Sequence, residues 1–189
     1  MSLKWLPNAI CIVRVLLVGP IVVMLLDERY LAALVLIAIA GFSDALDGFL
    51  ARVFDWRTPL GSLLDPAADK LLIVSVFLTL TVQGLVPVAV TVIVVLRDVV
   101  IIGGAAAYQW LIAPVQGEPT VISKLNTACQ LSFVLFTLTD AALMWPPEPV
   151  LTVLGAAVLF TSLTSGLNYV VGWSKRAWRG THGPVSAAD

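Results

Sequence analysis

The chain has 189 residues, of which 59% are hydrophobic and 12% are charged, and its mean hydropathy is +0.98. Soluble domains carry about 25% charged residues, so this composition excludes an ordinary soluble domain and indicates an integral membrane protein. The net charge of −1 gives no argument for a nucleic-acid partner. The length suits one helical domain, which we place at residues 1–174, followed by a short polar tail at 175–189.

Apolar runs bounded by turn residues recur along the whole chain. A membrane span needs about 20 mainly apolar residues. We expect such spans at residues 9–27, 30–53, 61–82, 85–109, 122–144 and 150–173. The predicted fold class is therefore all-α, a polytopic membrane protein built as a bundle of six transmembrane helices.

Basic residues are unevenly distributed between the two ends of these spans. If the spans alternate in direction, Arg29 is the clear basic residue of one side, and the other side holds Lys4, Arg52, Arg57, Lys175, Arg176 and Arg179. Because basic loops stay in the cytoplasm, we expect both termini to be cytoplasmic. No Arg/Ser-rich leader precedes the first span, which favours the bacterial inner membrane, with the mitochondrial inner membrane as the alternative.

Four aspartates stand in the second and third predicted spans. Asp44 and Asp47 lie three residues apart, and Asp65 and Asp69 lie four residues apart. On a helix each pair therefore shares one face. If the two helices are antiparallel, all four carboxylates point into one cleft, and under the predicted orientation this cleft lies near the cytoplasmic face.

Carboxylates this close together near a bilayer need a counter-charge, because desolvation and mutual repulsion disfavour their ionised forms. Carboxylate ligands favour Mg²⁺, Mn²⁺ or Ca²⁺ over zinc. Gly48, Ala51 and Gly61 leave room for a ligand beside the acids, and Arg52 adds a bidentate phosphate donor. Together these residues indicate metal-assisted phosphoryl chemistry.

The same residues follow the pattern D-x2-D-G-x2-A-R-x8-G-x3-D-x3-D without a departure. In order, the matching residues are Asp44, Asp47, Gly48, Ala51, Arg52, Gly61, Asp65 and Asp69. This pattern resembles the signature of the CDP-alcohol phosphatidyltransferase family. The resemblance implies one or two Mg²⁺ or Mn²⁺ ions, held by Asp44, Asp47, Asp65 and Asp69. It also implies a CDP-lipid site made by Asp44, Gly48, Ala51, Arg52, Gly61 and Asp65, and it assigns Asp69 as the base that deprotonates the acceptor.

Further polar residues fall inside the predicted spans, where ionisable groups are costly and point to function. We interpret Arg14, Arg97 and Lys124 as a cationic wall for the phosphate of an anionic acceptor, with Asn126 beside them. The alternative is that Arg97 pairs with Asp98 or a motif aspartate and only holds helices together. We expect a direct Arg97–Asp98 pair to be poor, because adjacent helix residues point about 100° apart.

Members of this family differ in their acceptor alcohol, and two segments bear on that choice. LRDVVIIGGAAAYQW and PTVISKLNTACQ resemble the cardiolipin synthases of the family, through Arg97-Asp98, Ser123-Lys124 and Gln130. Relatives that use glycerol 3-phosphate more often have Arg-Glu and Gly-Lys at the first two places. The resemblance therefore implies transfer from CDP-diacylglycerol to phosphatidylglycerol, giving cardiolipin and CMP, with phosphatidylglycerophosphate synthase as the alternative.

No serine, cysteine or histidine stands out as an activated nucleophile, so we expect direct displacement without a covalent intermediate. The family resemblance implies a homodimer among membrane lipids, and we expect no nucleic-acid partner. An ion channel or transporter with an acidic ion site is the remaining alternative from a different class. Such a protein would not need Gly48, Ala51 and Arg52 at these spacings.

Overall fold

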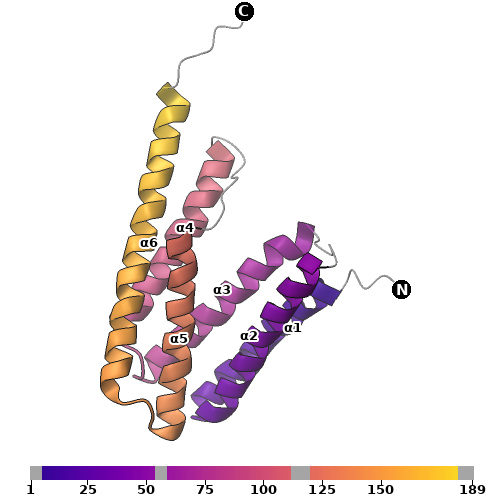
Figure 1. The fold of residues 1–189 in the computed structure, drawn as a ribbon, viewed down its shortest axis with the longest axis vertical. Helices are drawn as coiled ribbons and strands as arrows, with labels where there is room; N and C mark the ends of the chain where they lie inside the picture. Colours follow the sequence, from indigo (N-terminus) through magenta and orange to yellow (C-terminus); the bar gives the residue numbers. More distant parts are fainter. Residues whose placement is uncertain (1–5, 54–58, 112–119, 183–189) are drawn as a thin grey trace, which may run out of the picture.

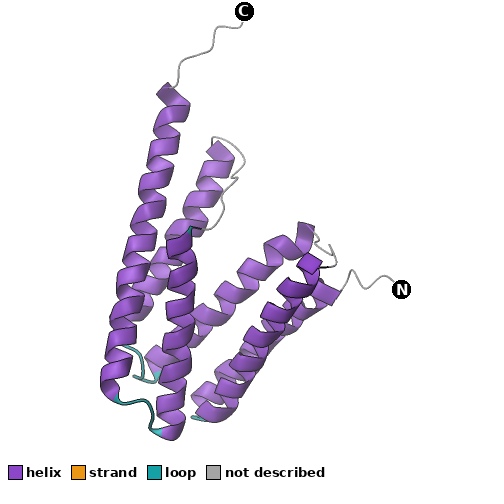
Figure 2. Cartoon of the chain, viewed as in Figure 1, coloured by secondary structure: helices purple, strands orange, loops and turns teal. Residues whose placement is uncertain are grey.

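The computed structural model describes the backbone of residues 6–53, 59–111 and 120–182, and the side chains of residues 12–43, 68–104 and 120–172. Within these ranges the regular elements are all helices, and no strand is present (Figure 2). In chain order the helices are α1 (Leu6–Leu26), α2 (Tyr30–Val53), α3 (Pro59–Val82), α4 (Val88–Leu111), α5 (Val121–Leu143) and α6 (Glu148–His182). The all-α prediction is confirmed for the described chain.

The helices begin and end within a few residues of the predicted spans, apart from the end of the last one. Helix α6 continues to His182, so residues 175–182 of the predicted tail are helical. Two segments of the described chain are long and apolar enough by themselves to cross a membrane, Val121–Leu143 and Glu148–Gly172. These segments support membrane association, whereas a crossing by all six helices stays a prediction.

The helices form two groups of three (Figure 1). Helix α1 packs against α2 and α3, while α6 packs against α4 and α5. We call α1–α3 the N-terminal half and α4–α6 the C-terminal half. The halves meet where α5 lies against α2 and α3 and where α4 lies against α3. In Figure 1 they are close at the lower end and diverge towards the upper end, where α2 ends and α3 begins.

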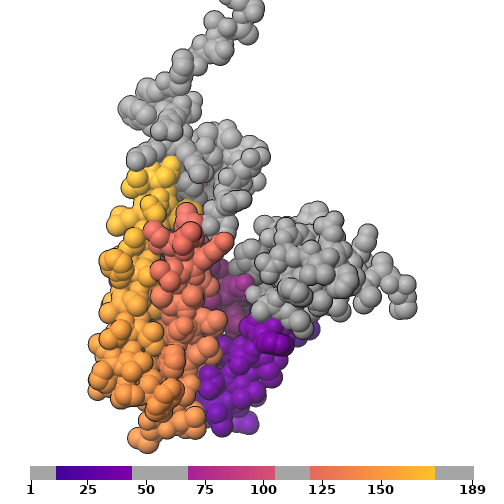
Figure 3. Space-filling model, in the orientation of Figure 1, coloured from indigo at the N-terminus to yellow at the C-terminus, as the bar shows by residue number. Residues whose placement is uncertain are grey.

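Buried apolar side chains from both halves form one core. Leu25, Phe77 and Leu138 are among the fully buried members. The rings of Phe77 on α3 and Phe133 on α5 stack with their centroids 6.1 Å apart, a geometry that stabilises aromatic pairs. The core therefore joins the halves, which touch along their lower parts in the space-filling view (Figure 3).

The outward-facing surface of the bundle is also apolar. Every helix carries large exposed apolar side chains, among them Leu16, Phe42, Val82, Val99, Leu125 and Phe160. Apolar surface spread over all sides of a bundle is unfavourable in water and favourable against lipid tails. The distribution of exposed side chains therefore agrees with the membrane prediction.

Polar contacts join the helices at the lower end of the bundle, where α1 and α3 end and α4 begins. This end is opposite to the one that holds the aspartate motif. The side-chain Nε2 of Gln83 donates to the carbonyl oxygen of Leu25, which joins the ends of α3 and α1. Across the α3–α4 turn, the hydroxyl oxygens of Thr81 and Thr91 lie 2.5 Å apart. Gly84 in this turn has a φ of +76°, a conformation that glycine adopts without strain. The Gln83 contact thus holds α1 against α3 at this end, and the Thr81–Thr91 contact holds α4 against α3.

Candidate active site

The aspartate motif lies at the junction of α2 and α3. Asp44 and Asp47 belong to the second half of α2, and Asp65 and Asp69 belong to the first half of α3. The side chains of most motif residues lie outside the described residues, namely Asp44, Asp47, Gly48, Ala51, Arg52, Gly61 and Asp65. The convergence of four carboxylates therefore stays a prediction, and the description of the site begins at Asp69.

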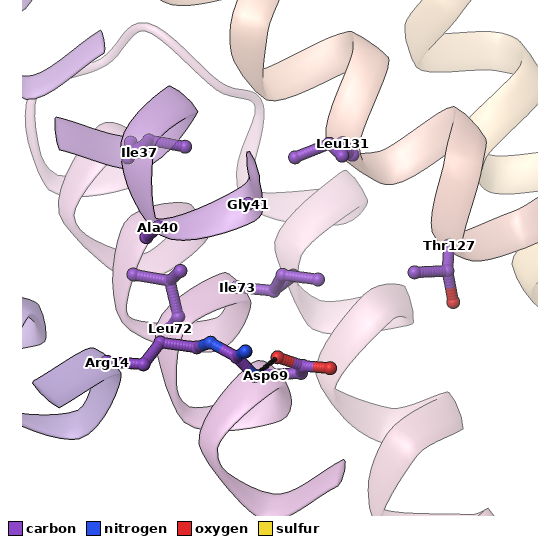
Figure 4. Close-up of a pocket in the computed structure, with 9 residues that line it drawn as sticks. All are labelled: Arg14, Ile37, Ala40, Gly41, Asp69, Leu72, Ile73, Thr127 and Leu131. Atoms are coloured by element: carbon purple, nitrogen blue, oxygen red, sulfur yellow. Dashed lines mark hydrogen bonds and ion pairs between the residues drawn. The ribbon is translucent and has the colours of Figure 1, made fainter. Parts of the chain in front are cut away.

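Asp69 contacts a buried arginine of α1. Its Oδ1 accepts a hydrogen bond from Nη1 of Arg14 (Figure 4). The Arg14 side chain is only 2% exposed, whereas the Asp69 side chain keeps 41% of its surface exposed. The arginine thus supports the carboxylate from the protein interior, and the carboxylate remains accessible to a ligand.

A groove with a volume of about 140 Å³ begins at this ion pair and crosses the junction between the two halves. Its lining residues are Arg14, Ile37, Ala40, Gly41, Asp69, Leu72, Ile73, Thr127 and Leu131. Figure 4 shows the α5 residues Thr127 and Leu131 across the groove from α2 and α3. This volume is smaller than the about 300–1,000 Å³ of pockets that hold a whole ligand, so the groove has room for only part of a substrate, with charge at one end and apolar walls beyond it.

The carboxylate of Asp69 is a suitable ligand for a hard divalent cation, because Mg²⁺ and Mn²⁺ prefer carboxylate oxygens. In the part of the chain with described side chains, no group of three or more His, Cys, Asp or Glu residues forms a metal site. Asp69 is the one predicted ligand within that part. Its accessible carboxylate fits the predicted role, which stays a prediction.

A second charged cluster joins α3 to α4. The Lys70 ammonium donates to Oδ1 of Asp98 over 2.8 Å, and Nη1 of Arg97 donates to the same oxygen over 2.5 Å. The side chains of Arg97 and Asp98 are 4% and 5% exposed, and that of Lys70 is 26% exposed. Two cations therefore share one buried carboxylate at the junction of the halves.

Arg97 also links α4 to the other two helices of its half. Its Nε and Nη2 donate to the Ser165 hydroxyl over 3.3 and 2.9 Å, and Nη2 donates to the Ser123 hydroxyl over 2.6 Å. The expectation that Arg97 and Asp98 make a poor pair is wrong. The angle of about 100° separates the Cβ directions, and the long arginine stem spans it while the two serines hold the other guanidinium atoms.

The two remaining residues of the predicted acceptor site lie in different surroundings. Lys124 is exposed on α5, while Asn126 is fully buried. The Asn126 Oδ1 accepts hydrogen bonds from Thr161 at 2.9 Å and Ser162 at 2.7 Å, so it joins α5 to α6. Among the described contacts none connects Arg14, Arg97 and Lys124, and their common role at an acceptor stays a prediction.

The predicted site does not include Lys70 or Ser165, and it treats Asp98 only as a possible partner of Arg97. One signal for Lys70 is its position directly after the last motif aspartate. Another is Asp98 itself, since an acid within an apolar helix needs a cation from some other helix. The signal for Ser165 is weaker, because hydroxyl residues are common at helix contacts in membranes.

Comparison with known proteins identifies similar sequences over most of the chain. The model of the CDP-alcohol phosphatidyltransferase family matches residues 4–166. The cardiolipin synthases (CMP-forming) of Rattus norvegicus and Homo sapiens are each 34% identical over 182 residues, covering 87% of this chain and 60% of the relative. The chain thus spans about 60% of the length of these relatives.

A second group of relatives carries a different name. CDP-diacylglycerol–glycerol-3-phosphate 3-phosphatidyltransferase of Aquifex aeolicus is 34% identical over 125 residues, covering 64% of this chain and 68% of the relative. The chloroplastic protein of that name from Oryza sativa is 34% identical over 188 residues, covering 87% of this chain and 55% of the relative. The similar proteins therefore carry the names of two different enzymes.

Proposed function

The chain belongs to the CDP-alcohol phosphatidyltransferase family, and from this membership we propose that it moves phosphatidyl from CDP-diacylglycerol to phosphatidylglycerol, giving cardiolipin and CMP. The observation that carries the proposal is the complete family signature, which ends at Asp69. The carboxylate of Asp69 is accessible, lies against Arg14 and lines a groove between the halves. The names of the rat and human relatives support phosphatidylglycerol as the acceptor.

The proposed reaction is a direct displacement. Asp69 takes the proton of the acceptor hydroxyl, and the acceptor oxygen forms a bond to the β-phosphorus of CDP-diacylglycerol. The bond from that phosphorus to the bridging oxygen breaks, and the electron pair leaves with CMP. Arg14 contacts Asp69 from the interior, so it orients the carboxylate towards the groove.

The proposed cofactor is Mg²⁺ or Mn²⁺, since the family is generally dependent on divalent metals. Its proposed ligands are Asp44, Asp47, Asp65 and Asp69. When bound, the metal neutralises the pyrophosphate and stabilises the leaving CMP. The proposed donor site adds Gly48, Ala51, Arg52 and Gly61, which belong to the same two helices.

We also propose that all six helices cross the membrane, with both termini and the aspartate motif on the cytoplasmic side. The arrangement of the helices supports this topology, because the start of α1, the end of α6 and the α2–α3 junction lie towards one end of the bundle (Figure 1). The proposed location is a bacterial inner membrane, or alternatively the mitochondrial inner membrane. A homodimer is the proposed assembly.

A second candidate is phosphatidylglycerophosphate synthase, which would use glycerol 3-phosphate as the acceptor. The relatives from Aquifex aeolicus and Oryza sativa favour this candidate. Both candidates use the same donor, release CMP and require the same motif. They differ only in the alcohol that approaches Asp69.

The test is CMP release by the purified protein, supplied with CDP-diacylglycerol and Mg²⁺ or Mn²⁺. Phosphatidylglycerol and glycerol 3-phosphate are offered separately, and the lipid products are resolved. We expect cardiolipin from the first acceptor and loss of the reaction when EDTA is added. Phosphatidylglycerophosphate from the second acceptor alone would establish the second candidate. Failure to release CMP with either acceptor would contradict both.

A further inference from the structure

Lys70 is the accessible member of the cluster that joins the two halves. It directly follows Asp69 on α3, and its ammonium lies 2.8 Å from the Asp98 carboxylate on α4. Its side chain is 26% exposed, whereas Asp98 is 5% exposed and Arg97 is 4% exposed. A ligand that approaches this cluster therefore meets Lys70 before it meets Asp98 and Arg97.

Lys70 and Arg97 also differ in how many of their N–H donors are already used in hydrogen bonds. A guanidinium has five N–H donors and an ammonium has three. Arg97 makes four bonds, to Asp98, Ser123 and twice to Ser165. Lys70 has Asp98 as its hydrogen-bond partner within the described residues. Within the described contacts Lys70 thus has donors left for an anion, while those of Arg97 are nearly all engaged.

The charges of the cluster formed by Lys70, Arg97 and Asp98 favour a negatively charged ligand. Among the described side chains, Lys70 and Arg97 together carry two positive charges, and they share the single negative charge of Asp98. In a region of low dielectric constant an uncompensated charge is costly and attracts an opposite charge strongly. Binding of an anion at Lys70 would neutralise the excess positive charge.

We propose that Lys70 binds the phosphate of the anionic acceptor, and that Asp98 and Arg97 are positioning residues which hold its ammonium in place. This inference rests on the proposed function, in which the second substrate is an alcohol that carries a phosphate. Asp69 and Lys70 are consecutive residues of α3. In both phosphatidylglycerol and glycerol 3-phosphate a glycerol unit separates the phosphate from a hydroxyl. In the proposal the phosphate binds Lys70 and the hydroxyl approaches Asp69. In this proposal Lys70 contacts the phosphate in place of Arg97, one of the residues predicted for that site together with Arg14, Lys124 and Asn126.

The test measures CMP release by the full chain at a saturating concentration of CDP-diacylglycerol. The concentration of phosphatidylglycerol is varied in one series and that of glycerol 3-phosphate in a second. For Lys70→Met we expect the acceptor KM to rise roughly 10- to 100-fold, the loss typical of a charged hydrogen bond. The donor KM stays unchanged. Lys70→Arg retains the positive charge, and most of the wild-type acceptor affinity should be kept.

Asp98→Asn should also raise the acceptor KM, because the Lys70 ammonium loses the carboxylate that holds it in place. Arg29→Met removes an exposed cation at the opposite end of the bundle and serves as the matched control.

Two results would overturn the proposal. One is a wild-type acceptor KM in Lys70→Met, and the other is an equal rise of donor and acceptor KM, which indicates a general structural defect. If Lys70→Met does not fold, Lys70→Gln takes its place, with thermal unfolding as the check on folding.

A binding measurement separates this inference from the proposed function. Thermal stabilisation of the wild type by phosphatidylglycerol or by glycerol 3-phosphate reports anion binding without chemistry. Stabilisation that is lost in Lys70→Met and kept in Lys70→Arg supports the anion site, even if the wild type releases no CMP and the proposed function fails. Equal stabilisation of Lys70→Met, or none for the wild type, overturns the site.

Discussion

The two halves of the bundle use their polar residues in different ways. In the N-terminal half, the Asp69 side chain is 41% exposed and lines a groove. In the C-terminal half, Arg97 and Asn126 are buried, and hydroxyls of neighbouring helices bond to the Arg97 guanidinium and to the Oδ1 of Asn126. The first half therefore presents a group that is accessible for chemistry, and the second uses polar groups to hold helices together.

This difference shows that a polar residue within an apolar helix does not by itself mark an active site. A bilayer offers no water, so every buried polar group seeks a partner inside the protein. Arg97 and Asn126 find such partners on α5 and α6. The features that distinguish a binding residue are its exposure and, for a cation, its remaining hydrogen-bond donors. Asp69 stands apart by its exposure, and Lys70 stands apart by its exposure within the charged cluster and by its donors.

The largest expected effect comes from the accessible residue of the N-terminal half. Asp69→Asn should lower turnover roughly 10²- to 10⁴-fold, the usual contribution of a general base. The amide retains the shape of the side chain, so binding of CDP-diacylglycerol should be largely preserved. CMP release measures turnover, and thermal stabilisation by the donor lipid measures binding. Asp27→Asn, in the distant α1–α2 turn, is the control. Near-wild-type turnover would remove Asp69 as the base.

The next effect concerns the buried cation of the C-terminal half. Arg97→Met should destabilise the fold by about 2 kcal/mol or more, because the hydroxyls of Ser123 and Ser165 lose a charged partner. Asp98 keeps Lys70 as its partner, so the acceptor KM should rise less than in Lys70→Met. Thermal unfolding and acceptor kinetics measure the two quantities. If Arg97→Met leaves the thermal unfolding unchanged and raises the acceptor KM strongly, Arg97 binds the acceptor.

A smaller effect is expected at Asn126, which also tests whether the buried polar residues of the C-terminal half hold helices together. Asn126→Leu removes the bonds to Thr161 and Ser162 and should cost about 1–2 kcal/mol, in line with polar contacts between membrane helices. The acceptor KM should not change. Thr161→Val removes one of these bonds and should have a smaller effect on thermal unfolding. A raised acceptor KM with unchanged unfolding would instead support the acceptor role predicted for Asn126.

The smallest effect is expected at the lower junction of the halves. Thr91→Val removes the contact with Thr81 and should cost about 0.5 kcal/mol, since bonds of this kind in membrane helices are weak. The Thr81 hydroxyl keeps the carbonyl of Phe77 as an acceptor. Thermal unfolding should shift slightly and the kinetic constants should stay the same. A change in acceptor KM would show that this junction also sets the geometry of the distant site.

Much of the fold was predictable because its determinants are local. Apolar runs ended by polar and turn residues located the helices to within a few residues. The extension of α6 to His182 was missed, because residues 175–182 are polar enough to leave a membrane and yet continue the helix. The motif was also predictable, since its residue types and spacings are a property of the chain alone.

The partners of the charged residues were not predictable in the same way. Arg14 and Asp69 lie 55 residues apart in the chain, Lys70 and Asp98 lie 28 apart, and Arg97 and Ser165 lie 68 apart. Each pair depends on how two helices pack and on the rotation of each about its axis. By itself the sequence determined the helices, the apolar surface and the family signature, because these depend on local composition and spacing. Only the tertiary structure decided that Asn126 lies buried against α6 and that Lys70 is the accessible cation of the cluster with Arg97 and Asp98, because pairing across helices depends on how they pack.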